Sequence, residues 1–153
     1  MTQKNKELLF KDLCARLPYG IVGKCEIDAS YDTSFDTIFQ THKFDAVVYG
    51  LKEDLLFVTP LIEDEDEQIF AEEEVADGVD ILDFTPYLFP LSSMTEEEKE
   101  EYCQLQQRII YNSKGVVNED VTKYINYCYK KHLDINNLIP MELAIDATGL
   151  NIY

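Results

Sequence analysis

Carboxylates are the most abundant side chains in this sequence that could do chemistry, and they are concentrated in one segment. The 153-residue chain has 30 Asp and Glu against 13 Lys and Arg, for a formal net charge of -17 at pH 7. Residues 53–98 hold 16 of the acids and no Lys, Arg or His, so the other 107 residues have 14 acids and 13 bases. The densest runs are Glu63, Asp64, Glu65, Asp66 and Glu67, followed by Glu72, Glu73 and Glu74.

Two interpretations of these runs concern the protein surface. A block of like charges is commonly a solvated, partly mobile loop that keeps a protein soluble. Alternatively, the eight carboxylates form a negative surface that binds a basic protein partner or imitates nucleic acid. We therefore take the eight as the candidate partner-binding residues. Ile69, Phe70 and Val75 lie among the acids and could hold the segment against the body of the protein or form an edge strand.

The spacing of the acids argues against a dedicated metal site. An EF-hand loop alternates acids through its first half and turns sharply at a central glycine. If the loop began at Asp64, Gln68 would stand where the third acid is needed, and Ile69 would stand where the glycine is needed. Clustered carboxylates can still bind Ca²⁺ or Mg²⁺ loosely, but we expect no structural metal and no cofactor.

Cysteine and histidine give no recognisable site. The four cysteines include no Cys-x-x-Cys pair, and neither His42 nor His132 lies at a zinc-ligand spacing from two of them. Cys14 and Cys128 fall on apolar helical stripes, so we expect both to be small buried residues. Cys128 and His132 are four residues apart on one predicted helix, but a catalytic nucleophile also needs a cleft, an orienting group and an oxyanion hole.

Catalytic signatures are absent from the sequence. Residues 20–24 are the nearest approach to a phosphate-binding loop, and they lack the Walker A spacing and the Ser or Thr after the lysine. There is no Gly-x-Ser-x-Gly elbow, His-Glu-x-x-His or Asp-Phe-Gly motif. No carboxylate in a run of surface acids is singled out for a raised pKa. A small enzyme is therefore an alternative hypothesis and not the leading one.

Composition limits the class of protein further. Hydrophobic residues make up 46% of the chain and aromatic residues 12%, which is enough for the core of a single domain over residues 1–153. The negative charge argues against direct binding of nucleic acid and against docking on anionic membranes. No apolar run is long enough to span a bilayer, and the first residues lack the apolar segment of a signal peptide. We expect a cytoplasmic protein; nothing in the sequence sets its oligomeric state.

The elements that would position these groups begin with an amphipathic helix over residues 8–17. Its apolar stripe is Leu9, Phe10, Leu13, Cys14 and Leu17, and we expect Lys6, Lys11, Asp12 and Arg16 to lie outside. Residues 18–20, Pro-Tyr-Gly, should end this helix.

A β region follows, with short apolar or alternating runs separated by turn residues. We expect strands at residues 21–27, 35–39, 44–49, 55–59 and 79–84, with a polar turn at 31–34. Strands of this length and spacing predict a small antiparallel sheet or an SH3-like barrel. The acidic runs would then lie in the long loop between the last two strands.

The last third of the chain is predicted to be helical. Prolines at 86 and 90 favour extended backbone, so residues 85–94 are interpreted as a connector between the β region (1–84) and the helical region (95–153). Thr95 and Glu98 have the spacing of a capping box. The helix that they start should reach Tyr111 and close at residues 112–115; Asn118 should cap the next, and residues 138–147 should pack back on the body. His132, at the end of that second helix, is interpreted as a satisfied boundary residue. The predicted fold class is thus α+β, with an N-terminal helix and a C-terminal helical pair.

Three stretches resemble a known family. Residues 11–20 (KDLCARLPYG), 86–98 (PYLFPLSSMTEEE) and 138–144 (LIPMELA) are similar to motifs of a family of small proteins encoded in gut Bacteroidetes genomes, prophages and mobile elements. Relatives tend to have Arg and Met where this chain has Phe89 and Leu91. The resemblance implies an intracellular bacterial or phage protein and carries over no catalytic residue.

The sequence thus favours a non-enzymatic, acidic protein-interaction module of phage or mobile-element origin. The main alternative is a DNA mimic that inhibits a host nucleic-acid-binding or defence protein. That alternative requires the carboxylates to be fixed on a rigid face.

Overall fold

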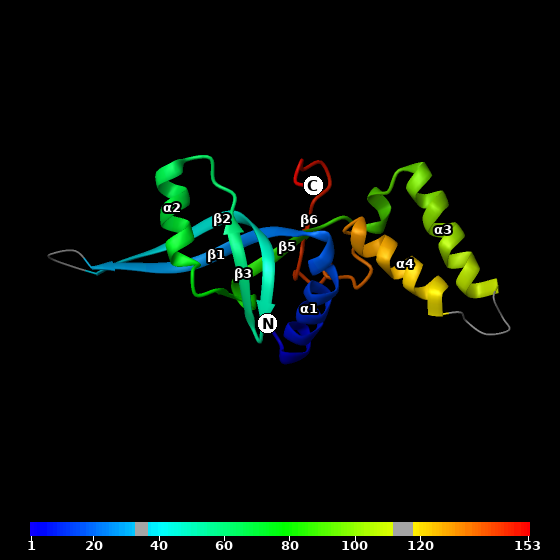
Figure 1. The fold of residues 1–153 in the computed structure, drawn as a ribbon, viewed down its shortest axis with the longest axis horizontal. Coiled ribbons are helices and arrows are strands. Elements are labelled where there is room, and N and C mark those ends of the chain that lie inside the picture. The colour runs from blue at the N-terminus through cyan, green and yellow to red at the C-terminus, as the bar shows by residue number, and fades with distance from the viewer. Residues whose placement is uncertain (33–36, 112–117) are drawn as a thin grey trace.

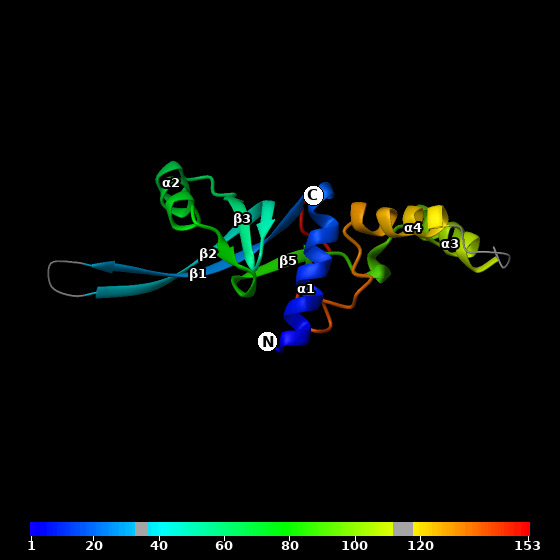
Figure 2. The ribbon, with the colours of Figure 1, turned by 60° about the horizontal axis from the view of Figure 1, so that its bottom comes forward.

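The computed structural model describes residues 1–32, 37–111 and 118–153. Figures 1 and 2 show an elongated molecule in which a sheet occupies the middle. Helix α1 crosses the sheet, a long β1–β2 arm and α2 lie at one end, and α3 and α4 lie at the other. The helices are α1 (Gln3–Arg16), α2 (Glu65–Glu74), α3 (Glu96–Tyr111) and α4 (Asn118–Lys130). The strands are β1 (Ile21–Asp32), β2 (Thr37–Lys52), β3 (Leu55–Pro60), β4 (Val79–Asp80), β5 (Phe84–Leu88) and β6 (Ile145–Asp146).

The strands form one curled, half-barrel sheet in the order β4-β3-β2-β1-β5-β6. Neighbouring strands are antiparallel except β5 and β6, which are parallel, so the sheet is mixed. The predicted α+β class, with its N-terminal helix and C-terminal helices, is confirmed. The sheet has one parallel pair because the chain returns from the helical region, and residues 145–146 then pair with β5 in the same direction.

Strands β1 and β2 form one long hairpin that runs from Ile21 opposite Val48 to Asp32 opposite Thr37. The two strands predicted at 35–39 and 44–49 are therefore one strand. Polar residues continue the ladder because they pair across it: Lys43 Nζ lies 2.9 Å from Glu26 Oε2, and Thr41 Oγ1 donates to Asp28 Oδ1 at 2.7 Å. The turn predicted at 31–34 lies partly outside the described residues.

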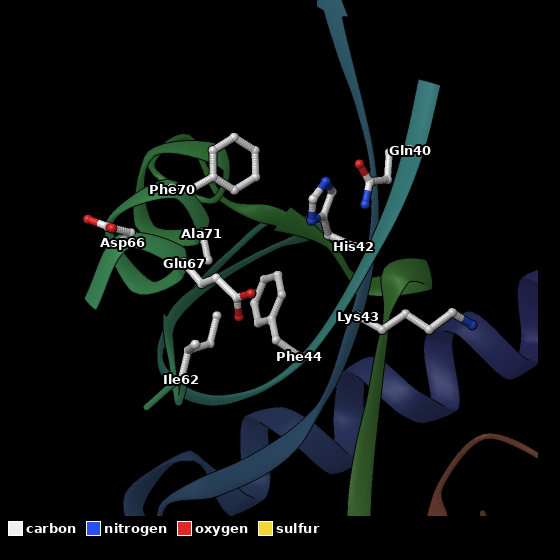
Figure 3. Close-up of a pocket in the computed structure, with 9 residues that line it drawn as sticks. All are labelled: Gln40, His42, Lys43, Phe44, Ile62, Asp66, Glu67, Phe70 and Ala71. Atoms are coloured by element: carbon white, nitrogen blue, oxygen red, sulfur yellow. The ribbon is translucent and has the colours of Figure 1, made fainter. Parts of the chain in front are cut away.

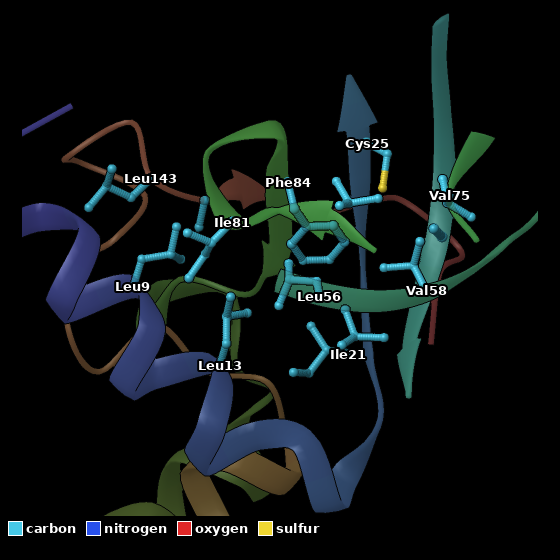
Figure 4. Close-up of a cluster of buried hydrophobic side chains, with 14 of the residues drawn as sticks. Leu9, Leu13, Ile21, Cys25, Leu56, Val58, Val75, Ile81, Phe84 and Leu143 are labelled. Carbon is cyan, nitrogen blue, oxygen red and sulfur yellow. The ribbon is translucent and has the colours of Figure 1, made fainter. Parts of the chain in front are cut away.

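The main hydrophobic core lies between α1 and the sheet (Figure 4). Its fully buried side chains are Leu9, Leu13, Ile21, Cys25, Ala46, Leu56, Ile81, Leu88 and Leu138. Phe84 lies directly over Gly23, where an added Cβ would overlap the phenyl ring and come within 2.6 Å of the Thr85 carbonyl oxygen. A glycine is required there because strand and ring approach so closely.

Helix α1 differs from its prediction in extent and in which residues it buries. It begins at Gln3, capped by Thr2 Oγ1, which accepts a hydrogen bond from the Asn5 amide at 3.2 Å. Asp12 and Arg16 are buried and Cys14 is exposed, so the expected positions of all three were wrong. The buried face includes positions 9, 12, 13 and 16, and the two charged groups on it form hydrogen bonds to each other.

The acidic runs were predicted to lie in a loop. In the structure they form α2 and the turn before it. Asp64 caps the helix, because its Oδ1 accepts hydrogen bonds from the Asp66 and Glu67 amides at 3.1 and 3.0 Å. Ala71 and Val75 pack into the main core, while Phe70 is half-buried and Ile69 is exposed. The cap and the apolar contacts explain why a segment with so much like charge is helical.

Residues 79–90 also differ from the prediction of a strand followed by a connector. The chain forms the two-residue β4, a single 3-10 turn at Ile81–Asp83, and then β5, which lies between β1 and β6. Pro86 is tolerated in β5 because the pairing with β6 begins beyond it, at Tyr87. The extended backbone expected around the prolines is present, but it belongs to the sheet.

The helical end of the molecule follows its prediction closely. Glu98 N donates to Thr95 Oγ1 at 3.2 Å and Thr95 N donates to Glu98 Oε2 at 3.0 Å, which confirms the capping box. Helix α3 reaches Tyr111 and α4 begins at Asn118; the predicted closure at 112–115 lies outside the described residues. Leu138, Leu143 and Ala144 pack into the main core, as expected for a segment that returns to the body.

Candidate functional site

The eight predicted partner-binding residues all lie on α2 or in the turn that precedes it. All eight side chains are exposed, and α2 is held to the body beneath them by Ala71, which is 3% exposed, and by Val75, which is 4% exposed. Gln68 connects the helix to the preceding segment, because its Oε1 accepts a hydrogen bond from the Ile62 amide at 3.1 Å. Within the helix, its Nε2 donates to Glu72 Oε1 at 2.6 Å. The carboxylates are therefore presented on an anchored helix.

Within the described part of the chain, none of these eight carboxylates forms an ion pair with Lys, Arg or His. Other exposed acids do: Glu96 pairs with Lys99, and Glu119 pairs with Lys123. Among the same described residues, no three His, Cys, Asp or Glu side chains are grouped so that they could hold a metal ion. The negative charge of α2 is thus not neutralised by any ion pair within residues 1–32, 37–111 and 118–153.

The two ends of α2 carry acids with opposite consequences for helix stability. Glu65, Asp66 and Glu67 are in the first turn, where the helix dipole is positive and favours them. Glu73 and Glu74 are in the last turn, where the dipole is negative, and no basic residue accompanies them there. Carboxylates at this end oppose the helix dipole, so local helix stability does not explain them.

A groove of about 380 Å³ runs between α2 and β2 (Figure 3). Apolar side chains from both elements and from the β3–α2 connection form much of its surface, together with several polar ones. The lining residues are Gln40, His42, Lys43, Phe44, Ile62, Asp66, Glu67, Phe70 and Ala71. The rings of His42 and Phe70 face each other across it, with centroids 5.0 Å apart.

The groove brings together residues that sequence reasoning did not connect. Gln40, His42 and Phe44 alternate along β2, so their side chains lie on the strand face that α2 covers. A sequence signal for this face existed in that alternation and in the apolar residues inside the acidic block. This signal did not predict the groove because the acidic block was expected to be a loop. With a loop there, no helix would face β2.

The second histidine, His132, lies in a separate buried cluster beside a cavity of about 360 Å³. Its ring stacks on Tyr153 with centroids 3.7 Å apart and planes 13° apart. Burial, reinforced by the charge of Arg16, lowers the pKa of His132 to about 4. The imidazole is therefore neutral at pH 7, and its Nδ1 has no hydrogen-bond partner among the described residues, contrary to the expectation of a satisfied side chain.

Cys128 is buried, as predicted, four residues before His132. Burial raises the pKa of the Cys128 thiol, so the thiol is protonated at neutral pH. A protonated thiol is a poor nucleophile. The enzyme hypothesis expected a pocket beside a histidine, and both histidines line one, so that hypothesis stays a prediction.

The chain matches no protein-family model, no curated protein and no solved structure. Among the helices in the described residues, none is long and apolar enough to cross a membrane.

Proposed function

We propose that this protein is a non-enzymatic interaction module that binds a basic segment of a partner protein through α2. The observation that carries the proposal is the pair Glu73 and Glu74 at the C-terminal end of that helix. They oppose the helix dipole, and no residue of the described chain forms an ion pair with them. Sequence features that break a local stability rule without compensation are commonly functional.

The anchoring of α2 supports the same proposal. A charged surface on a packed helix loses little conformational freedom on binding, so more of its electrostatic attraction becomes affinity. The same field accelerates encounter with a basic partner and weakens with salt. The family resemblance of residues 11–20, 86–98 and 138–144 supports a bacterial cytoplasmic setting and an origin in a phage or mobile element.

The test uses the full chain and a short, fluorescein-labelled peptide of alternating arginine and serine, measured by fluorescence anisotropy. The variant Glu73→Gln/Glu74→Gln should weaken binding roughly fivefold to tenfold, because two exposed charge pairs are lost. The matched control is Glu100→Gln/Glu101→Gln on α3, which removes the same charge from exposed helical positions. The control should change the affinity less than about twofold, and equal losses in both variants would overturn the proposal.

A DNA mimic is the second candidate, favoured by the helical order of the acidic runs. Carboxylates one helical turn apart are separated by about 5.4 Å along the axis, so the helix repeats negative charge at short, regular intervals, as a phosphate backbone does. The test is competition: the wild-type chain should displace duplex DNA from a purified HU-type protein, and Glu73→Gln/Glu74→Gln should do so less well. Binding of the basic peptide without displacement of DNA would leave only the first candidate.

A further inference from the structure

The groove between α2 and β2 differs from the rest of the acidic surface because it combines aromatic walls with a carboxylate. We infer that this groove is the anchor site for an arginine side chain of the basic partner. The inference rests on the proposed function and adds the identity of the residue that the surface recognises.

The aromatic walls provide the first element of recognition. Phe44 and Phe70 both line the groove, one from β2 and one from α2. A guanidinium is planar, weakly hydrated and attracted to aromatic faces, whereas an ammonium is compact and strongly hydrated. Walls of this kind favour arginine over lysine.

The carboxylate of Glu67 provides the second element. Figure 3 shows it turned toward the Phe44 ring, while the carboxylate of Asp66 points away from the groove. No ion pair or hydrogen bond occupies the Glu67 carboxylate among the described residues. A guanidinium placed against Phe44 would therefore meet an unneutralised carboxylate with which it can form a charge-assisted hydrogen bond.

The one lysine of the groove does not compete for this position. Lys43 extends to the opposite side of β2 in Figure 3, where its Nζ lies 2.9 Å from Glu26 Oε2. Its charge is thus paired with β1 and directed away from Glu67. The groove volume of about 380 Å³ is at the lower end of the range for ligand sites, about 300–1,000 Å³, and suits one long side chain with its adjoining backbone.

The test compares three labelled peptides of one design, in which the basic position is arginine, lysine or the uncharged arginine analogue citrulline. The variant Glu67→Gln is matched with Glu65→Gln, because both remove one charge from the first turn of α2 and only Glu67 lines the groove. A second variant, Gln40→Arg, places a guanidinium at an exposed position on the groove wall, where it should occupy the site within the chain. Circular dichroism confirms that each variant is folded.

We expect the arginine peptide to bind about tenfold more tightly than the lysine peptide and the citrulline peptide to bind weakest. Glu67→Gln and Gln40→Arg should each weaken binding of the arginine peptide about tenfold. Glu65→Gln removes one charge of the same binding surface outside the groove and should weaken binding only about twofold to threefold. Equal affinity for arginine and lysine, or equal effects of Glu67→Gln and Glu65→Gln, would overturn the anchor site. If Glu73→Gln/Glu74→Gln still weakens binding in that case, the proposed function stands; if it has no effect either, both fail.

Discussion

Asp12 and Arg16 form a fully buried ion pair one turn apart on α1, and through it they join α1 to the segment that follows α4. Arg16 Nη2 donates to the Leu133 carbonyl oxygen at 2.8 Å, and Asn136 Nδ2 donates to Asp12 Oδ1 at 2.7 Å. The ring of Tyr129 lies over the guanidinium, with 4.8 Å between its centroid and Cζ. Both charges belong to the KDLCARLPYG stretch, so the structure gives that motif a structural role.

Removing either partner of this pair should destabilise the protein strongly. Asp12→Ala leaves Arg16 as an uncompensated buried charge, which costs about 3–5 kcal/mol. Replacing both, in Asp12→Leu/Arg16→Met, should cost less than either single change because no buried charge remains. Urea denaturation measures the difference. Lys11→Ala, at the exposed neighbouring position, is the control, and a loss for Asp12→Ala as small as the control's would contradict the prediction.

Gly23→Ala should destabilise the sheet because the new methyl group collides with Phe84 and with the Thr85 carbonyl oxygen, 2.6 Å from the Cβ position. Overpacking of this kind costs about 1–3 kcal/mol. Gly50→Ala, also in a strand, is the matched control, since its Cβ would lie 3.5 Å from Phe57, an ordinary contact. Thermal unfolding should show a clearly lower midpoint for Gly23→Ala than for Gly50→Ala; equal midpoints would mean that the ring can move aside.

The two ends of α2 should respond with opposite sign to loss of their acids. Asp64→Ala removes the helix cap and should lower the free energy of unfolding by about 1 kcal/mol. Glu73→Gln/Glu74→Gln removes carboxylates that oppose the dipole and should raise it by about 0.3–1 kcal/mol at low salt. Urea denaturation at low and high salt checks both, because salt should shrink only the second effect. A stability loss in the double variant would show that these acids hold the fold together.

The free energy of unfolding should decrease as the pH is lowered from 6.5 to about 4, because of His132. Burial, with the charge of Arg16, lowers its pKa from 6.5 to about 4, so over that interval the unfolded chain binds a proton that the folded chain does not. The free energy of unfolding should drop by roughly 3 kcal/mol in total, with no contribution above this window and no further loss below it. His132→Asn, which tolerates the positive φ of 52° at this position, should lack this component. Parallel pH profiles for the two proteins would refute it.

Local sequence rules predicted the elements whose stabilising contacts are also local. The Thr95–Glu98 capping box was placed correctly because both partners lie within one helical turn. The end of α1 before Pro18 and the strands predicted at residues 21–27 and 55–59 are of the same kind. Helix α2 was missed although Asp64 is a good cap, since the density of like charge indicated a loop. The packing of Ala71 and Val75 into the main core outweighs that repulsion, and this core includes side chains of α1 and β1, which are distant in the chain.

By itself, the sequence determined that the net negative charge is concentrated in one segment, that the fold is α+β, and that the Thr95–Glu98 capping box starts α3. Only the tertiary structure decided that Asp12 and Arg16 are buried, because their hydrogen-bond partners lie more than 100 residues further along the chain. It also decided that Glu67 and Phe44 line the same groove. The physical reason is the same in both cases: a polar group's environment depends on which distant elements pack against it, and spacing along the chain does not encode that.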